Sequence, residues 1–370
     1  MFAKKVILEN YRNISYAEAE LSPSVNLFYG KNAQGKTNFL ESVYLFSQAK
    51  SFRTSKDKEF CKFGEEKATA TLIYECGGRE QRLSVSVFSD SRRKQMNVNG
   101  FEVKKNSQLQ GNFFTVLFAP EHLNLVKEGP SERRRFLDIA ISPLKSKYAT
   151  MLEEYEKILT HKNALLKDIY KYPQLRDTLP VWEEKQAAAG AYIAFMRSSY
   201  IEKIKQFAAM EHSEISSGKE ELSLEYIGFS DNKSDYSSLE ACKKALFDKI
   251  IENEEEEIRA GMSLVGPQRD DMEILINGVP ARSFASQGQQ RSAVLSLKLA
   301  EGKAVYDTVG EHPVFLLDDV MSELDASRRS FILNKIKDQQ VIITGCDKAR
   351  YKTHHNIAYF FVKNGNIVKR

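Results

Sequence analysis

Short apolar runs and period-two alternation in the first hundred residues predict β-strands. Residues 25–29 form an apolar run bounded by turn formers, and residues 83–87 alternate in the manner of a half-buried strand. Asn99 and Gly100 stand between two further apolar runs, and both tolerate the positive φ that a two-residue hairpin needs. The same dipeptide recurs at Asn277-Gly278 and Asn364-Gly365. The chain therefore begins as a β-rich structure with tight hairpins.

The middle of the chain has helical periodicity instead. From residue 148 to 169 the apolar residues fall on one helical face, and a second helix runs from about residue 181 to beyond residue 207. Pro173 and Pro180 lie in the turn between them. This pattern suggests an antiparallel hairpin, which is either an arm with a partner surface or ordinary packing within a helical domain. The polar stretch that follows predicts a loop with one strand at 222–227.

After residue 266 the β pattern returns. Residues 313–317 and 340–344 are continuous apolar runs of the kind found in buried parallel strands, separated by helical stretches. The fold class is therefore α/β, with one lobe built from both chain ends and a mostly helical lobe inserted between them. We expect residues 1–120 and 262–370 in the first lobe (lobe I) and residues 121–261 in the second (lobe II).

The composition is that of a soluble, folded chain. The 370 residues are 42% hydrophobic, which excludes disorder, and no window approaches the roughly 18 uninterrupted apolar residues of a membrane span. The four cysteines show neither metal-ligand spacing nor a disulfide framework, and we expect them to be reduced thiols. His354 and His355 also lack ligand spacing, and we expect them at the surface. A cytoplasmic protein without a membrane partner is expected.

The net charge of +4 conceals a split along the chain. Residues 1–150 hold 24 basic and 16 acidic side chains, whereas residues 211–260 hold 6 basic and 14 acidic ones. The basic clusters include Arg92, Arg93, Lys94, Lys104 and Lys105, which are candidates for binding a nucleic-acid backbone or, alternatively, charges that protect a sheet edge. No motif for reading base sequence accompanies them, so any DNA binding would be independent of sequence.

A phosphate-binding loop follows the apolar run at residues 25–29. The stretch fits G-x-x-x-x-G-K-S/T and precedes a helical pattern, so its backbone N–H groups and the helix dipole converge on phosphate. Lys36 is expected to reach the β- and γ-phosphates, and the Thr37 hydroxyl is expected to ligate Mg²⁺. The predicted nucleotide-binding residues are Gly30, Lys31, Asn32, Ala33, Gln34, Gly35, Lys36 and Thr37.

Two carboxylates follow the buried run at residues 314–317. Asp318 and Asp319 would be costly inside a core, so they belong at the end of a strand that faces a site. Asp318 is predicted to bind Mg²⁺ directly or through water. Asp319 is predicted to orient or deprotonate the attacking water, which makes it catalytic together with Lys36 and Asp318.

A second anion site is predicted where the helix after residue 285 begins. Ser286, Gly288 and Gln289 offer hydroxyl and backbone donors at a helix N-terminus. Because one chain already has a phosphate cradle, the second suggests a composite site completed by another subunit. Ser322 and Asp325 follow the acidic strand and would link the two halves of such a site.

The order of these motifs resembles the head of the ABC-type ATPases, in the branch shared with the structural-maintenance-of-chromosomes proteins. Several stretches also resemble the RecF family of recombination mediators, at residues 8–12, 51–54, 129–138, 266–271 and 285–291. The resemblance implies an ATPase head lobe, a helical lobe with a short arm, and ATP with Mg²⁺ as cofactors. By the same resemblance Ser286 and Gly288 contact the γ-phosphate held by a partner subunit, and Arg12 approaches the nucleotide.

The function that the resemblance implies is an ATP-dependent DNA-binding protein of recombinational repair. ATP would close a homodimer around duplex DNA near single-strand gaps, help to load recombinase with RecR as partner, and act in DNA replication and the SOS response. Because Asp319 stands where transporter-type relatives have Glu, hydrolysis is expected to be slow and to serve as a switch, stimulated weakly by DNA.

Other departures from the family pattern limit what is carried over. Gln268 stands where the family commonly has His, no water-positioning Gln is evident near residues 120–122, and no His follows Ile343. A P-loop phosphotransferase acting on a small metabolite is the alternative function, although it leaves residues 286–291 unexplained. A third possible function is that of the nucleotide-binding subunit of a membrane transporter.

Overall fold

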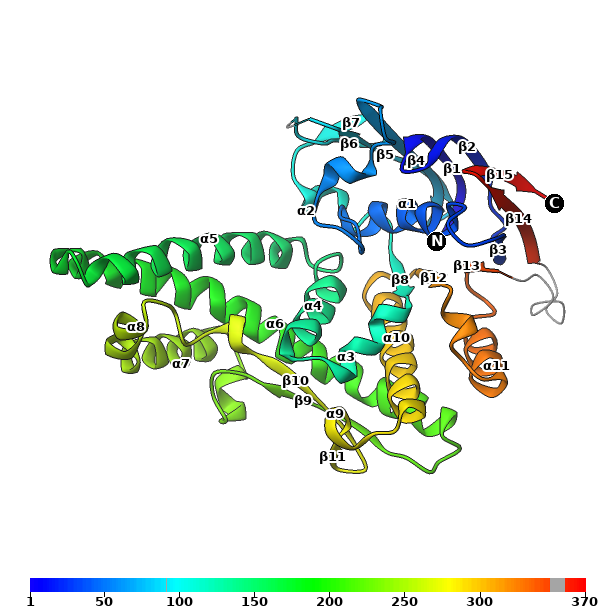
Figure 1. Cartoon of the computed structure of the whole chain (residues 1–370). Helices are drawn as coiled ribbons and strands as arrows, with labels where there is room; N and C mark the ends of the chain where they lie inside the picture. The colour runs from blue at the N-terminus through cyan, green and yellow to red at the C-terminus, as the bar shows by residue number, and fades with distance from the viewer. Residues whose placement is uncertain (91, 347–356) are drawn as a thin grey trace. The chain divides into compact units, whose positions relative to one another are not determined.

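The computed structural model describes residues 1–90, 92–346 and 357–370, which form two compact units (Figure 1). Unit 1 comprises Met1–Leu123, Glu214–Ser216 and Arg291–Arg370, and unit 2 comprises Asn124–Ser213 and Ser217–Gln290. His354 and His355 lie outside the described residues. Within the described part of the chain, no helix has the length and apolar character that crossing a membrane requires.

An antiparallel sheet forms one layer of unit 1. Its alternating burial follows the period-two pattern of the sequence, because one face covers the core and the other meets solvent. In spatial order its strands are β2 (Ile14–Glu20), β1 (Phe2–Tyr11), β4 (Lys67–Cys76), β5 (Arg79–Phe88), β6 (Gln95–Val98) and β7 (Phe101–Val103).

The second layer of unit 1 is a mostly parallel sheet drawn from both ends of the chain. Its central strands are buried along their whole length, as their continuous apolar runs predict. In spatial order its strands are β15 (Asn366–Lys369), β14 (Ile357–Lys363), β3 (Val25–Tyr29), β13 (Val341–Gly345), β12 (Val314–Asp318) and β8 (Thr115–Phe118). The prediction of a lobe built from both chain ends is confirmed.

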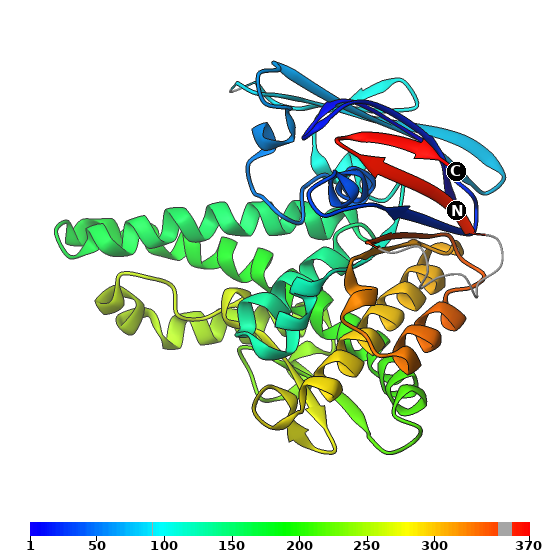
Figure 2. The same ribbon diagram turned by 45° about the vertical axis from the view of Figure 1, so that its right-hand side comes forward.

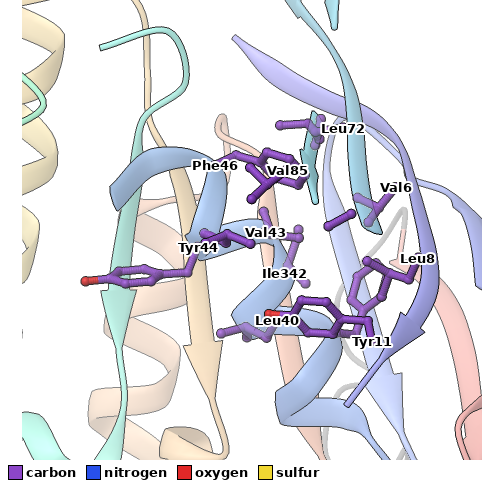
Figure 3. Packing of buried hydrophobic residues seen from close by; sticks show 14 of the residues in the cluster. Val6, Leu8, Tyr11, Leu40, Val43, Tyr44, Phe46, Leu72, Val85 and Ile342 are labelled. Atoms are coloured by element: carbon purple, nitrogen blue, oxygen red, sulfur yellow. The ribbon is translucent and has the colours of Figure 1, made fainter. Parts of the chain in front are cut away.

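Helix α1 (Lys36–Gln48) packs against strands of both sheets. It is buried on nearly every side, so its apolar residues do not form a single stripe. Figure 3 shows Leu40, Val43 and Phe46 of α1 in one cluster with side chains from both sheets, namely Val6, Leu8, Tyr11, Leu72, Val85 and Ile342. The smaller helices of the unit are α2 (Asn106–Leu109) and α11 (Ala326–Lys335), and α10 (Gln287–Val309) begins in unit 2 and ends in unit 1.

Unit 2 is mostly helical. Its remaining helices are α3 (Asn124–Lys127), α4 (Pro130–Ile141), α5 (Ser146–Ile169), α6 (Leu179–Ile215), α7 (Leu239–Glu252), α8 (Glu254–Ala260) and α9 (Ala281–Phe284). The long helices α5 and α6 lie side by side (Figure 2). They run antiparallel, because the His161 ring stacks on Trp182 near the turn while Tyr148 contacts Arg197 far from it. The predicted helical hairpin is confirmed.

A small sheet accounts for the difference between the predicted and the observed division of the chain. Strand β10 (Asp271–Ile276) pairs with β9 (Leu222–Ile227) and with β11 (Val279–Pro280). Residues 262–290 therefore fall in unit 2, whereas the sequence analysis places them in the lobe with the chain ends. The strand at 222–227 is found as predicted, but its pairing partner is not evident from local pattern.

The three predicted Asn-Gly turns each join two antiparallel strands. Asn99 and Gly100 have φ values of 51° and 87°, the left-handed pair that suits the twist of a two-residue hairpin. The equivalent turns connect β10 to β11 and β14 to β15. These hairpins set the register of the strands around them.

Candidate nucleotide-binding site

The loop between β3 and α1 has the backbone shape of a phosphate cradle. Gly30 has φ of 152°, and a Cβ there would lie 2.3 Å from the Val362 carbonyl oxygen. Gly35 has φ of 111°, and a Cβ there would lie 2.8 Å from Asn13 Oδ1. Both positions therefore require glycine, since a side chain would be strained and would collide. Ala33 is also left-handed, with φ of 60°.

Residues from the C-terminal part of the chain brace this loop. The Asn364 N–H donates to Gln34 Oε1 over 2.7 Å, and the Gly365 N–H donates to the Gln34 carbonyl over 3.0 Å. At the other side, the Cys346 thiol lies 2.9 Å from Asn32 Oδ1. The final hairpin thus holds the phosphate loop in position, which gives a physical reason for building the unit from both ends of the chain.

Lys36 and Thr37, at the start of α1, carry the polar groups of the site. The Lys36 ammonium donates to the Gly30 and Lys31 carbonyls over 2.7 and 2.9 Å. It is buried and folded back onto its own loop. The Thr37 hydroxyl donates to Asp318 Oδ1 over 2.9 Å. The structure thus brings together the two predicted Mg²⁺ ligands, which lie 281 positions apart in the chain.

Asp318 ends β12, and parallel pairing places it opposite Thr344 at the end of β13. The Thr344 hydroxyl donates to Asp318 Oδ1 over 2.7 Å, so one carboxylate oxygen accepts from two threonines. Burial raises the pKa of the Asp318 carboxyl, while the bonds from Thr344 and Thr37 act in the opposite direction. Glu121 and Asp319 raise this pKa further by repulsion between like charges.

Asp319 adopts the left-handed conformation, with φ of 51°, and its N–H donates to Thr344 Oγ1 over 2.9 Å. Thr344 therefore fixes both acidic residues at once. This role of Thr344 is not predicted from the sequence, although aligning the two apolar runs by their ends places Thr344 beside Asp318. Glu121, whose charge raises the pKa of Asp318, stands in the stretch where a water-positioning Gln is expected.

The predicted donors fit Mg²⁺ chemically. A hydroxyl and a carboxylate are hard oxygen ligands, and Mg²⁺ commonly takes few protein ligands and completes its shell with phosphate and water. Asp318 is a buried carboxyl with a raised pKa, so a cation beside it would relieve an unfavourable charge. Across the described residues, no cluster of three or more His, Cys, Asp and Glu side chains offers a metal site built from protein alone.

Arg12 lies against the helix that carries Thr37. Its guanidinium makes a bidentate ion pair with Glu41, with N···O distances of 2.9 and 2.8 Å, and packs over the Phe60 ring. Glu41 is fully buried and lies one turn beyond Thr37 on the same face of α1. The structure thus ties Arg12 to the phosphate-loop helix, while its approach to a nucleotide stays a prediction.

The predicted second anion site lies at the start of α10 and belongs to unit 2. The Ser286 hydroxyl accepts from the Gln289 N–H over 3.3 Å, and Gln289 Oε1 accepts from the Ser286 N–H over 2.8 Å. This reciprocal pair is a capping box. Ser286 is exposed and Gly288 is half-buried.

The residues after β12 are held by side chains of unit 1. The Ser322 hydroxyl donates to the Asp319 carbonyl over 2.6 Å. Asp325 caps α11 by accepting from the Arg328 N–H, a bond that lowers the pKa of the Asp325 carboxyl. Glu323, between them, pairs with Arg291 of α10 at 3.2 Å. The predicted linking segment is thus ordered by local bonds that include the helix of the second anion site.

The predicted DNA-binding residues lie around the β6–β7 hairpin at one edge of the antiparallel sheet. Arg92 pairs with Asp90 and stacks over Phe88, and Lys94 pairs with Asp57. Arg93, Lys104 and Lys105 are exposed. Arg92 is exposed as well, so four of the five cations lie at the surface and only Lys94 is half-buried.

A phosphate loop next to a paired Thr and Asp, in a two-layer unit built from both chain ends, defines a nucleotide-binding head of the P-loop class. The family of RecF/RecN/SMC N-terminal domains matches residues 2–368. The fold alone is shared with the Smc head domain of Pyrococcus furiosus, at a TM-score of 0.57 and 16% identity over 100% of this chain and 96% of that one.

The chain belongs to the RecF family. It is 39% identical to the DNA replication and repair protein RecF of Ruminiclostridium cellulolyticum over 99% of both chains. It is 40% identical to that of Alkaliphilus oremlandii over 99% of this chain and 100% of the relative. A solved structure of the recombination mediator protein RecF with ATP in the RecFOR pathway superposes with a TM-score of 0.90 and 36% identity, covering 100% of this chain and 97% of that one.

Proposed function

We propose that this chain is an ATP-switched DNA-binding protein of recombinational repair. Its relatives are DNA replication and repair proteins, and the solved relative carries ATP in the RecFOR pathway. The observation that carries the proposal is the contact between Thr37 and Asp318 beside the phosphate loop. ATP would bind at residues 30–37, in a loop whose two glycines and left-handed Ala33 leave backbone donors directed at phosphate.

Each polar side chain of the site has a role in this proposal. Lys36 would exchange its bonds to loop carbonyls for the β- and γ-phosphates. Thr37 and Asp318 would hold Mg²⁺, which when bound supplies positive charge to the phosphate oxygens. Asp319 would orient the attacking water, and its N–H bond to Thr344 keeps it beside Asp318. A single short carboxylate in this role supports slow hydrolysis that acts as a release switch.

The second half of the site would come from another copy of the chain. The exposed Ser286 hydroxyl and the first turn of α10 would form a second anion-binding end, in addition to the phosphate loop of unit 1. Two copies would therefore close around two nucleotides, each phosphate loop meeting Ser286, Gly288 and Gln289 of the other copy. Ser322 and Asp325 would lie next to this contact.

DNA would bind through its phosphates, without reading sequence. The basic excess of the first 150 residues and the exposed Arg93, Lys104 and Lys105 support this. The closed dimer would hold duplex DNA near a single-strand gap, help to load recombinase and take RecR as partner. Hydrolysis would be stimulated weakly by DNA.

The proposal is tested by ATPase activity and gel filtration of the full chain. Hydrolysis is titrated with duplex, single-stranded and gapped DNA at two salt concentrations, and we expect stimulation that falls as salt rises. ATP with Mg²⁺ should shift the chain from monomer to dimer. A chain that stays monomeric at micromolar concentrations, with or without DNA, would refute the composite site.

Two variants separate the halves of the site. Lys36→Ala should abolish ATP binding. Ser286→Arg should leave ATP binding intact yet block dimerisation, because the longer cation occupies the position of the partner's phosphate. Loss of ATP binding in both variants would mean that Ser286 serves its own subunit's nucleotide.

A further inference from the structure

Glu220, in the acidic segment at residues 211–260, contacts the predicted second anion site. Glu220 Oε1 accepts from Gln289 Nε2 over 3.0 Å. Its other oxygen, Oε2, lies 3.0 Å from Nε2 of His212, a fully buried residue of α6. All three residues belong to unit 2. A hydrogen-bonded chain thus runs from α6 through the acidic segment to the first turn of α10.

This chain fixes the orientation of the Gln289 amide. Its oxygen accepts from the Ser286 N–H over 2.8 Å, while its nitrogen donates to Glu220. Rotation of the amide would sacrifice both bonds, and the bond to Glu220 is strengthened by the charge of the carboxylate. Gln289 is therefore held from two sides.

The orientation of Ser286 follows from that of Gln289. The Ser286 oxygen accepts from the Gln289 backbone N–H over 3.3 Å, so its own O–H remains a donor toward solvent. Ser286 is exposed, which leaves this donor accessible to a phosphate of another molecule. The direction of the hydroxyl thus depends on Gln289, and the position of Gln289 depends on Glu220.

We infer that Glu220 is a positioning residue for the composite nucleotide site. It holds Gln289, and through Gln289 the Ser286 hydroxyl, in the geometry that receives the γ-phosphate bound by a second copy of the chain. This inference rests on the proposed ATP-dependent dimer and assigns a role to one residue of the acidic segment. Glu220 does not touch the nucleotide.

The matched control is the next residue along the chain. Glu221 is exposed, and its backbone N–H donates to Asn277 Oδ1 over 2.8 Å. Glu220→Gln and Glu221→Gln make the same chemical change, from a carboxylate to an amide, at adjacent positions. Only the change at 220 alters the group that accepts from Gln289.

The test measures ATP binding and ATP-dependent dimerisation separately. For Glu220→Gln we expect ATP affinity within about twofold of the unmodified chain and dimerisation weakened about fivefold, because the Gln amide oxygen still accepts from Gln289 but lacks the charge that makes such a bond roughly twice as strong. Glu221→Gln should leave both unchanged. A fold defect would lower ATP binding and dimerisation together, and Trp182 fluorescence reports directly whether unit 2 is folded.

A double-mutant cycle with Gln289→Leu decides whether Glu220 acts through Gln289. The double variant should dimerise no worse than Gln289→Leu alone, because Gln289→Leu already removes the contact that Glu220→Gln weakens. Additive losses would overturn the inference, as would Glu220→Gln dimerising as well as Glu221→Gln. If the unmodified chain fails to dimerise with ATP, the proposed function itself fails, and that result is distinct from either of these.

Discussion

The core around the phosphate loop and the helical arm bury different kinds of side chain. In unit 1, the Phe28 ring stacks on Phe39 and on Phe360, with centroid distances of 4.1 and 4.6 Å. In unit 2, the fully buried Lys162 ammonium lies 2.7 Å from Glu257 and 3.9 Å from Glu183. The aromatic core around Phe28 is therefore apolar, although unit 1 also buries the ion pair of Lys298 with Glu301, whereas the helical arm is held in part by buried charges.

Further buried charges in unit 2 join elements that are distant in the chain. Arg197 of α6 pairs with Asp138 of α4 at 2.8 Å and with Asp270 at 3.3 Å. Arg133, one of the three arginines at the start of α4, pairs with Asp271 at 2.6 Å. Apolar packing is non-directional, and its stabilisation does not depend on pH. A buried ion, by contrast, requires a partner of opposite charge, and its stabilisation changes when either group titrates. We therefore expect the stability of the two units to respond differently to truncation of side chains and to pH.

The largest effect is expected in the apolar scaffold. Phe360→Ala should destabilise unit 1 by about 3–5 kcal/mol, because it removes a fully buried ring and leaves a cavity beside Phe28. Hydrogen exchange of the β3 and α1 amides would measure this loss. Phe361→Ala is the control, since Phe361 is only half-buried. Equal losses for both variants would contradict a core centred on Phe360.

In unit 2, removal of a buried charged side chain should reduce stability by nearly as much. Arg197→Ala should cost about 3 kcal/mol, because it leaves the buried Asp270 and the half-buried Asp138 without this cation. Trp182, the only tryptophan of the sequence, lies in unit 2, so its fluorescence during urea unfolding reports this unit. Lys205→Ala removes an exposed ion pair with Glu202 and should cost under about 1 kcal/mol. The comparison fails if the two variants unfold at the same urea concentration.

Sequence reasoning found the features that are local in the chain. The Asn-Gly turns, the phosphate loop and the buried strands ending at Asp318 each depend on a few adjacent residues whose conformational demands are specific.

What the sequence did not reveal depends on pairing between distant segments. Thr344 reaches Asp318 only because β12 and β13 align in parallel register. The boundary after residue 261 was misplaced because β10 pairs with β9 rather than with a strand of unit 1. Glu220 and Gln289 are 69 positions apart, and nothing in either neighbourhood marks their contact.

Thr344 offers a change at the site that leaves both scaffolds intact. Thr344→Val removes a donor to Asp318 and the acceptor of the Asp319 N–H, so both acidic residues lose a fixed orientation. Loss of such a supporting bond typically costs 10–100-fold in activity or metal affinity. We expect a decrease of about tenfold in ATP hydrolysis and a higher Mg²⁺ requirement. Thr160→Val, on an exposed face of α5, should change neither, and an unaffected Mg²⁺ dependence in Thr344→Val would disprove the role.

The smallest expected effect is on the pH dependence of the stability of unit 2, and it arises from Glu183. Among the described residues neither of its carboxylate oxygens has a hydrogen-bond partner, and burial raises its pKa above the ordinary value. Lys162 acts against this rise, while Glu254 and Glu257 add to it and Arg176 opposes it. Since the folded pKa exceeds the unfolded one, the folded state binds the extra proton, and its stability falls as pH rises through the folded pKa.

Glu183→Gln removes this titration while keeping the shape of the side chain. Its stability relative to the unmodified chain should be nearly unchanged near pH 5 and should increase toward pH 8, where the unmodified chain must bury a charge. Urea unfolding followed by Trp182 fluorescence at both pH values measures the difference. Glu184→Gln, at an exposed neighbouring position, should give no such trend. If Glu183→Gln is instead less stable than the unmodified chain at pH 8, then the carboxylate is a favourable partner of Lys162, and the arm is stabilised by its full set of charges rather than strained by one of them.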